Sequence, residues 1–207
     1  MFPRDEPGSE ALKETSPLDG AFAQLPAQWA PDLATATSCT PTQQVQPLTT
    51  NKTTLTGLIS SLTANGATSG ALGTAWAWYM ISPTWNENTI FTGSQAPAAY
   101  GTSNLKKIAV LMTDGEYNCA YSDIYGNCTN WDTQANSTRA VALCNGMKAK
   151  GIEVYTIGFK LDVQAAIDTL SSCATDANHF FQASDAAGLD AAFKAIAYRS
   201  VPVHVEK

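Results

Sequence analysis

One acidic residue stands where a buried strand of this sequence is expected to end. Residues 106–113 begin with two lysines, continue with five apolar residues and lead into Thr-Asp-Gly. This pattern predicts a buried parallel strand, and open α/β sheets bind their ligands at the carboxyl ends of such strands. A carboxylate there needs a cation, a hydroxyl group or backbone N–H groups around it. Asp114 is therefore the first candidate for chemistry, with the alternative that it closes a tight Asp-Gly turn.

The segments that must position Asp114 alternate between helical and strand patterns. Strands are predicted at 106–113, 152–159 and 179–181. Apolar residues spaced by three and four predict helices, in which the stripes are Leu55, Leu58, Ile59 and Leu62; Leu72, Trp76, Tyr79 and Met80; Ala140, Leu143, Cys144 and Met147; Val163, Ala166, Ile167 and Leu170; and Leu189, Ala192, Phe193 and Ile196. This alternation predicts an α/β fold with a mainly parallel sheet covered on both faces.

The chain divides into three parts by composition. Residues 1–47 are rich in proline and without periodicity, which predicts a loop or linker of poor order. Residues 48–200 carry the predicted helices and strands, with Thr50 or Asn51 as the first helix cap and Asn65-Gly66 as its stop. Residues 201–207 form a tail. The stretches 84–104 and 119–128 are interpreted as polar surface loops.

The charge and hydropathy of the chain argue against some classes of function. The 207 residues carry a net charge of −6 and a pI near 4.8, which argues against nucleic-acid binding because that function needs a basic patch. No apolar run of about 18 residues is present, so no membrane span is predicted. The first residues contain no apolar core of a signal peptide.

The five cysteines lack zinc-site spacing. Cys119 with Cys128, and Cys144 with Cys173, are candidate disulfides, which leaves Cys39 unpaired. In the chain-entropy model the shorter loop contributes about 2.7 kcal/mol and the longer about 3.6 kcal/mol. Two such bridges would suit an extracytoplasmic protein. The alternative is a set of free thiols in a reducing compartment.

Several motifs, taken in order, resemble a known family. Gly66-Ala67-Thr68 before a helix, followed by the strand ending in Thr113-Asp114-Gly115-Glu116, resembles the second half of a von Willebrand factor A domain. The tract from Cys39 to about Ala197 is more closely similar to the C-terminal region of TadG-like proteins of tight-adherence (Flp) pilus assembly. The similarity runs through Pro47-Leu48-Thr49, Trp76-Ala77-Trp78, 81–85, 111–118, 144–148, 151–159 and Cys173-Ala174.

The resemblance implies a Rossmann-like three-layer fold and a site for a divalent cation, Mg²⁺ in complete relatives. Thr68 and Asp114 match the family's threonine and aspartate ligands, although Thr68 could instead cap the following helix. The family's Asp-x-Ser-x-Ser motif is missing, so the site is expected to be incomplete. We therefore expect an N-terminally truncated domain that lacks its first strands and leaves one edge of the strand at 106–113 unpaired.

The resemblance also implies a non-enzymatic module of the cell envelope that binds a protein partner. The expected binding rim contains Ser69, Gly115, Glu116 and Asn118, and full-length relatives are expected to be membrane-anchored. The alternatives are a metal-independent structural fragment and, more remotely, a metal-dependent hydrolase that uses Asp114. No motif places a second acid or histidine beside that residue.

Overall fold

The protein has three layers, with a parallel sheet between two layers of helices. The computed structural model describes residues 45–63, 68–86, 93, 96–119, 121–122 and 128–200. The sheet contains β1 (Ile108–Thr113), β4 (Glu153–Phe159) and β5 (Phe180–Ala183) in the order β1-β4-β5, and both pairings are parallel. The predicted α/β class with a parallel sheet is confirmed.

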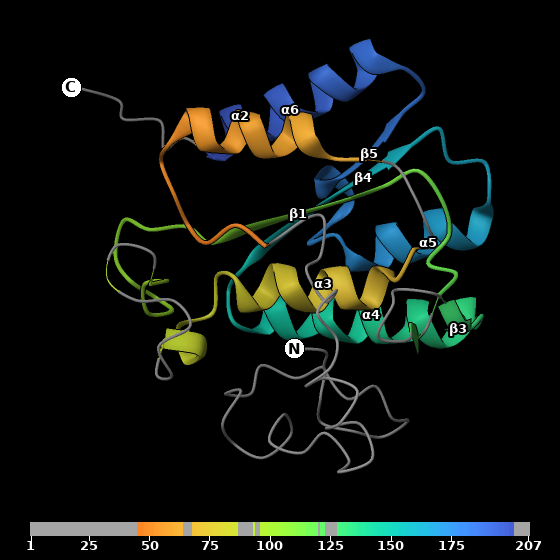
Figure 1. Cartoon of the computed structure of the whole chain (residues 1–207), viewed down its shortest axis with the longest axis horizontal. Coiled ribbons are helices and arrows are strands. Elements are labelled where there is room, and N and C mark those ends of the chain that lie inside the picture. The colour runs from red at the N-terminus through yellow and green to blue at the C-terminus, as the bar shows by residue number, and fades with distance from the viewer. Residues whose placement is uncertain are drawn as a thin grey trace, which may run out of the picture.

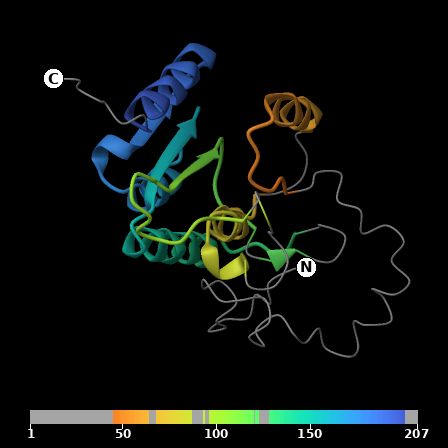
Figure 2. The same ribbon diagram turned by 90° about the vertical axis from the view of Figure 1, so that its left-hand side faces the viewer.

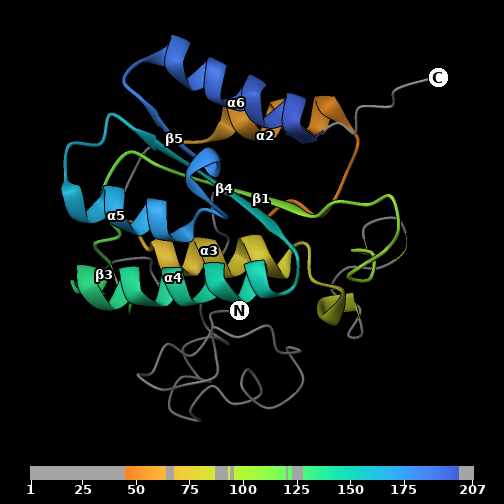
Figure 3. The ribbon, with the colours of Figure 1, turned by 180° about the vertical axis from the view of Figure 1, so that it is seen from behind.

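Helices cover both faces of this sheet. The helices α3 (Gly70–Tyr79), α4 (Thr133–Ala149) and α5 (Gln164–Cys173) lie on one face, as Figures 1 and 3 show. The helix α6 (Ala186–Ser200) packs on the other face, against β4 and β5. On that same side, α2 (Lys52–Ser61) stands apart from α6 and beyond β1 (Figure 2). Short 3-10 turns occur at Pro83–Asn86 and Ala177–His179.

The ends of several elements follow from local chemistry. Asn51 caps α2 by accepting a hydrogen bond from the N–H of Thr54 at 3.1 Å, as one of the two predicted caps. Asp132 caps α4 in the same way through Ala135. Gly151 has φ 75°, a left-handed conformation that glycine adopts without strain, and it follows the end of α4. The Asn65-Gly66 stop, Cys39, residues 1–44 and the tail 201–207 lie outside the described residues.

The buried face of α3 differs from the predicted stripe. The predicted residues were Leu72, Trp76, Tyr79 and Met80, but of these only Tyr79 is buried. The helix instead buries a face that contains small residues, because α4 comes very close to it: a Cβ atom added to Gly146 would lie 2.4 Å from the ring of Trp78. The other buried residues of α3 are Gly70, Ala71, Thr74, Ala75 and Trp78.

One strand of a short antiparallel pair lies inside the polar loop predicted between Cys119 and Cys128, and the other begins at Cys128. A short antiparallel hairpin forms between β2 (Tyr121–Ser122) and β3 (Cys128–Asn130). Cys119 and Cys128 are bonded with their Cα atoms 5.6 Å apart, and Cys144 and Cys173 with theirs 5.0 Å apart. Both predicted disulfides are therefore confirmed, and the second joins α4 to α5 within the core.

Candidate functional site

Asp114 lies on an exposed turn directly after β1. The Thr113 hydroxyl donates to the carbonyl of Gly115 at 3.1 Å and accepts from its N–H at 3.3 Å. Thr113 therefore closes the turn, which is the role that the sequence left open for Asp114. Among the described contacts, none engages the Asp114 carboxylate, and its side chain faces solvent.

The loop of Thr68 is fastened to the segment that follows Asp114. Asn118 accepts a hydrogen bond from the Thr68 N–H through its Oδ1 at 3.0 Å. The N–H of Cys119 donates to the carbonyl of Thr68 at 3.1 Å. These two bonds join segments 50 residues apart in sequence and place the predicted site residues Thr68 and Asp114 on neighbouring loops at one edge of the sheet.

A buried asparagine, which sequence reasoning missed, organises this edge. Asn136 is fully buried near the start of α4. Its Oδ1 accepts from the N–H of Ala71 at 2.8 Å, and its Nδ2 donates to the carbonyls of Cys119 at 2.6 Å and of Thr68 at 3.4 Å. The side chain of Asn136 thus forms hydrogen bonds with backbone groups of the first turn of α3 and of both loops. Its position in the sequence could have indicated this burial. Asn136 precedes Ala140 by four residues and so lies on the same helical face as the predicted core stripe.

Helix α3 begins without help from Thr68. Its N-cap is Ser69, which makes no side-chain capping bond, and Asn136 supplies the acceptor for Ala71 instead. Capping by Thr68, the alternative to metal ligation, is therefore wrong as a description of this helix. The Thr68 hydroxyl has no hydrogen bond among the described contacts, whereas its backbone N–H and carbonyl are both engaged.

Tyr117 packs beneath this edge of the sheet, against the start of α3. Its ring is buried against the first turn of α3, where a Cβ atom added to Gly70 would lie 2.0 Å from the ring carbon Cγ. Burial raises the pKa of the Tyr117 hydroxyl, and a hydrogen bond with Thr74 opposes that rise only in part. Only glycine leaves room for this contact, so the start of α3 and the turn after Asp114 are packed as one unit.

The four residues of the predicted rim are all partly exposed to solvent. Ser69, Gly115 and Glu116 are half-buried, and Asn118 is half-buried because it holds Thr68. The hairpin of β2 and β3 follows directly, and Trp131, just after it, is 66% exposed. The edge therefore combines the carboxylates of Asp114 and Glu116 with small polar residues and the exposed ring of Trp131.

The donor set at this edge does not by itself fit Mg²⁺. That cation takes octahedral oxygen coordination and loses its water reluctantly, so it needs more than one hydroxyl and one carboxylate from the protein. Within the described ranges, no three His, Cys, Asp or Glu side chains gather as a metal-binding group. Thr68 and Asp114 alone therefore do not make a Mg²⁺ site.

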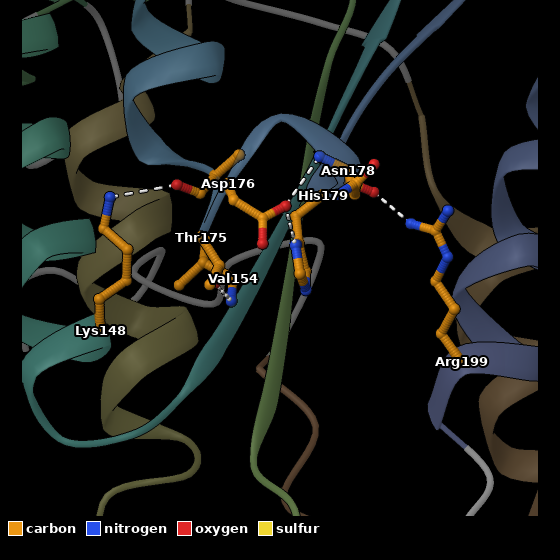
Figure 4. A network of polar contacts seen from close by, with 8 residues as sticks. Lys148, Val154, Thr175, Asp176, Asn178, His179 and Arg199 are labelled. Atoms are coloured by element: carbon orange, nitrogen blue, oxygen red, sulfur yellow. Dashed lines mark hydrogen bonds and ion pairs between the residues drawn. The ribbon is translucent and has the colours of Figure 1, made fainter.

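A shallow hollow of about 400 Å³ lies at the opposite end of the sheet, where β4 begins. Its charged groups already have partners: Lys106 pairs with Glu153 at 2.9 Å and His179 with Asp176 at 2.7 Å. The hydrogen bond from His179 lowers the pKa of Asp176. The remaining hydrogen bonds in Figure 4 involve the backbone. Lys148 donates to the carbonyl of Ala174, the Val154 N–H to Thr175, the Asn178 N–H to Asp176 and Arg199 to the carbonyl of Asn178.

Among the described helices, none combines the length and the apolar character that a membrane crossing requires.

A comparison of the sequence with known protein families is consistent with the α/β fold described above. The sequence matches the family model of the von Willebrand factor type A domain over residues 36–195. A search of curated proteins gave no match, and a search of solved structures gave none. Domains of this family serve in general in protein–protein interaction and adhesion, and they can bind a metal ion at the carboxyl edge of the sheet. The match spans well over half of the chain, which therefore belongs to the von Willebrand factor type A domain family.

Proposed function

We propose that this chain is a non-enzymatic, TadG-like module of the cell envelope that serves in pilus assembly or adhesion by binding a protein partner. The partner would dock on the carboxyl edge of the sheet, against the rim of Ser69, Gly115, Glu116 and Asn118. Two disulfides support an extracytoplasmic location, because such bonds persist in oxidising compartments.

The observation that carries this proposal is the joining of the Thr68 loop to the segment after Asp114. The bonds from Thr68 to Asn118 and from Cys119 to Thr68 hold two distant loops as one surface. Asn136 fixes that surface from beneath, so a partner would meet a preformed edge and lose little entropy in ordering it. The free carboxylate of Asp114 lies in this edge.

A cation is a conditional part of the proposal. Thr68 and Asp114 would supply two oxygen ligands, and further ligands would have to come from groups outside the described residues. A cation held there would attract an acidic side chain of the partner. Because Thr68 and Asp114 do not satisfy Mg²⁺ alone, this mechanism requires those further ligands.

The second candidate is a metal-independent scaffold that binds by shape. The disulfide between Cys119 and Cys128 closes the hairpin of β2 and β3, and Trp131 follows it with most of its ring in solvent. Tryptophan is enriched among the interface residues that contribute most of the binding free energy. In this version Asp114 contributes as a charge and no cation is needed.

Photo-cross-linking tests where the partner docks. A photoreactive residue at Glu116, on the rim, is compared with one at Lys194, which is exposed on α6 at a distance from the rim. Cross-links to one envelope protein from Glu116, absent from Lys194, would support the proposal. Equal cross-linking from both positions, or none from the rim, would overturn it.

Calorimetric titration with Mg²⁺ distinguishes the two versions. The chain is titrated beside its Asp114→Asn variant and beside a version that carries an upstream Asp-x-Ser-x-Ser strand. Binding only in the extended version supports a metal-dependent site, whereas binding lost in the Asp114→Asn variant of the present chain supports further ligands within it. If no version binds Mg²⁺, the metal-independent scaffold is favoured.

A further inference from the structure

The charged side chains of this fold are separated by sign between the two ends of the parallel sheet. The strands β1, β4 and β5 all end, and the helices α4, α5 and α6 begin, on one side of the molecule, here called the carboxyl end (Figure 1). The opposite side is called the amino end. Among the described residues of 106–200, the carboxyl end carries five acids and one base: Asp114, Glu116, Asp132, Asp162, Asp185 and Lys160. The amino end carries five bases and two acids: Lys106, Lys107, Lys148, Lys150, Arg199, Glu153 and Asp176.

Helix capping explains only part of this separation. Asp132 and Asp185 accept hydrogen bonds in the first turns of α4 and α6, and Lys148 donates to carbonyls at the end of α5. Asp162 is exposed and forms no hydrogen bond or ion pair among the described residues. Arg199 is exposed and donates to a backbone carbonyl, which leaves its positive charge in place. Asp162 and Arg199 are therefore opposite charges, at opposite ends, that no ion pair neutralises.

The two ends also differ in shape. At the amino end, the hollow of about 400 Å³ lies between the start of β4 and the end of α6, and Lys106 and Arg199 line it. At the carboxyl end, the turn after β4 exposes Lys160 and Asp162. Lys160 has φ 54°, and its N–H donates to the carbonyl of Ala183 at 2.7 Å, which fastens this turn to the end of β5. One end is thus hollowed, and the other carries an exposed turn that is held in place.

Exposed apolar side chains accompany the charges at both ends. Val163, which follows Asp162 at the carboxyl end, is 40% exposed. At the amino end, Leu105 precedes Lys106 and is 46% exposed, and Tyr198 precedes Arg199 and is 79% exposed. Protein interfaces combine apolar contacts at their centre with polar groups around them. Each end therefore has both components of an interface, with charges of opposite sign.

We propose that copies of this chain associate head to tail, with the acidic carboxyl end of one molecule docked on the basic amino end of the next. The turn of Asp162 and Val163 would enter the hollow lined by Lys106 and Arg199, and Tyr198 would cover it. Opposite charges on the two surfaces favour encounter in this orientation over contact between like ends. Because the two surfaces are different, each added copy leaves one surface of each kind free, and the contact repeats instead of closing.

This contact is separate from the proposed function and from the outer edge of β1. Its surfaces lie at the ends of β4 and β5 and at the end of α6, and neither includes a residue of the rim. The partner is a second copy of the chain, so a test of the contact needs no other protein. Its result is therefore independent of the photo-cross-linking from Glu116.

Sedimentation velocity on the full, oxidised chain tests the proposal. At about 20 mM salt the weight-average sedimentation coefficient should keep rising with chain concentration up to about 1 mM, because the contact repeats. Raising the salt to about 500 mM should weaken the association at least about tenfold, since exposed charges are then screened.

Two charge reversals identify the surfaces. Asp162→Lys disables the acidic surface and Arg199→Glu the basic one, and each alone should weaken the association at least about tenfold. Mixed in equal amounts, the two variants should form a dimer and nothing larger, because each retains the surface that the other lacks. Arg199→Gln, which keeps a donor for the Asn178 carbonyl, serves if circular dichroism shows that the reversal unfolds the chain.

The matched controls are Asp190→Lys and Lys194→Glu, the same reversals on the exposed face of α6 between the two ends. Both should associate like the parent chain, and an equal weakening in them would overturn the proposal. A parent chain that stays monomeric over the whole concentration range at low salt would also overturn it. So would a limit at the dimer, which indicates a closed symmetric contact, or two folded variants that form no dimer when mixed.

Discussion

Replacing Asn136 by alanine should loosen the whole carboxyl edge. The side chain is fully buried and makes three hydrogen bonds, to the backbone of Ala71, Cys119 and Thr68. Truncation removes the acceptor for Ala71 and the donor for Cys119, and both of these residues are buried. Water would replace the lost partners poorly, so α3 and the two loops should separate.

The expected loss of stability follows from the two buried backbone groups that are left without a hydrogen-bond partner. A buried donor or acceptor left without a partner costs about 1–3 kcal/mol. Two such groups, with the longer bond to Thr68 counted as negligible, predict a loss of about 3 kcal/mol in the free energy of unfolding. For a domain of ordinary stability this is a large fraction of the total. The effect should also reach Thr68, whose amide resonance is expected to shift.

Equilibrium urea unfolding of the oxidised protein measures this loss, with Asn145→Ala as the matched control. Asn145 lies in the same helix but is exposed, so its replacement should change stability by less than about 0.5 kcal/mol. The reasoning is refuted if Asn136→Ala loses less than about 1 kcal/mol or matches the control. An unchanged Thr68 resonance in a destabilised variant would also contradict the proposed coupling.

Three further predictions concern the packing, the disulfides and the acid limit of stability. Gly70→Ala should destabilise the chain by about 1–3 kcal/mol, measured by thermal unfolding, because its new Cβ atom would overlap the ring of Tyr117. Replacing Cys144 and Cys173 together by alanine should lower the free energy of unfolding by about 3.6 kcal/mol in urea, from the loss of loop closure. Asp176→Asn should make the free energy of unfolding depend less steeply on pH in the acid range. The folded pKa of Asp176 is lowered, so its contribution is present above the unfolded value of about 3.9 and is lost as the pH falls through the folded value.

Each of these predictions has its own control. Gly73→Ala lies in the same helix with no atom within 4 Å of the new Cβ, so it should stabilise by about 0.5–1 kcal/mol; equal losses at both glycines would contradict the overlap. Mild reductant should open the bond from Cys119 to the half-buried Cys128 before the buried bridge, and the reverse order would be unexpected. Asn145→Ala, which removes no charge, should leave the pH dependence of stability in the acid range as in the parent chain, and an equal flattening in this variant would remove the assignment to Asp176.

Patterns within single segments predicted most of the fold. The apolar run at 106–113 became β1, and the stripe from Ala140 to Met147 became the buried face of α4. Both disulfide pairs were predicted, as was the one-sided pairing of β1 among the described strands. The truncation that motivated the last expectation stays a prediction. The hairpin of β2 and β3 was missed because each strand is only two or three residues long.

The candidate site was predicted in part. The sequence alone located Asp114 at the end of a strand and Thr68 before a helix, because alternation and apolar spacing report the burial of each element from its own residues. Only the tertiary structure decided that Asn136 bonds across 65 residues to Ala71, and that α3 buries its small face against α4. Those contacts depend on how closely two distant helices approach, and that distance is set jointly by both surfaces rather than by the periodicity of either.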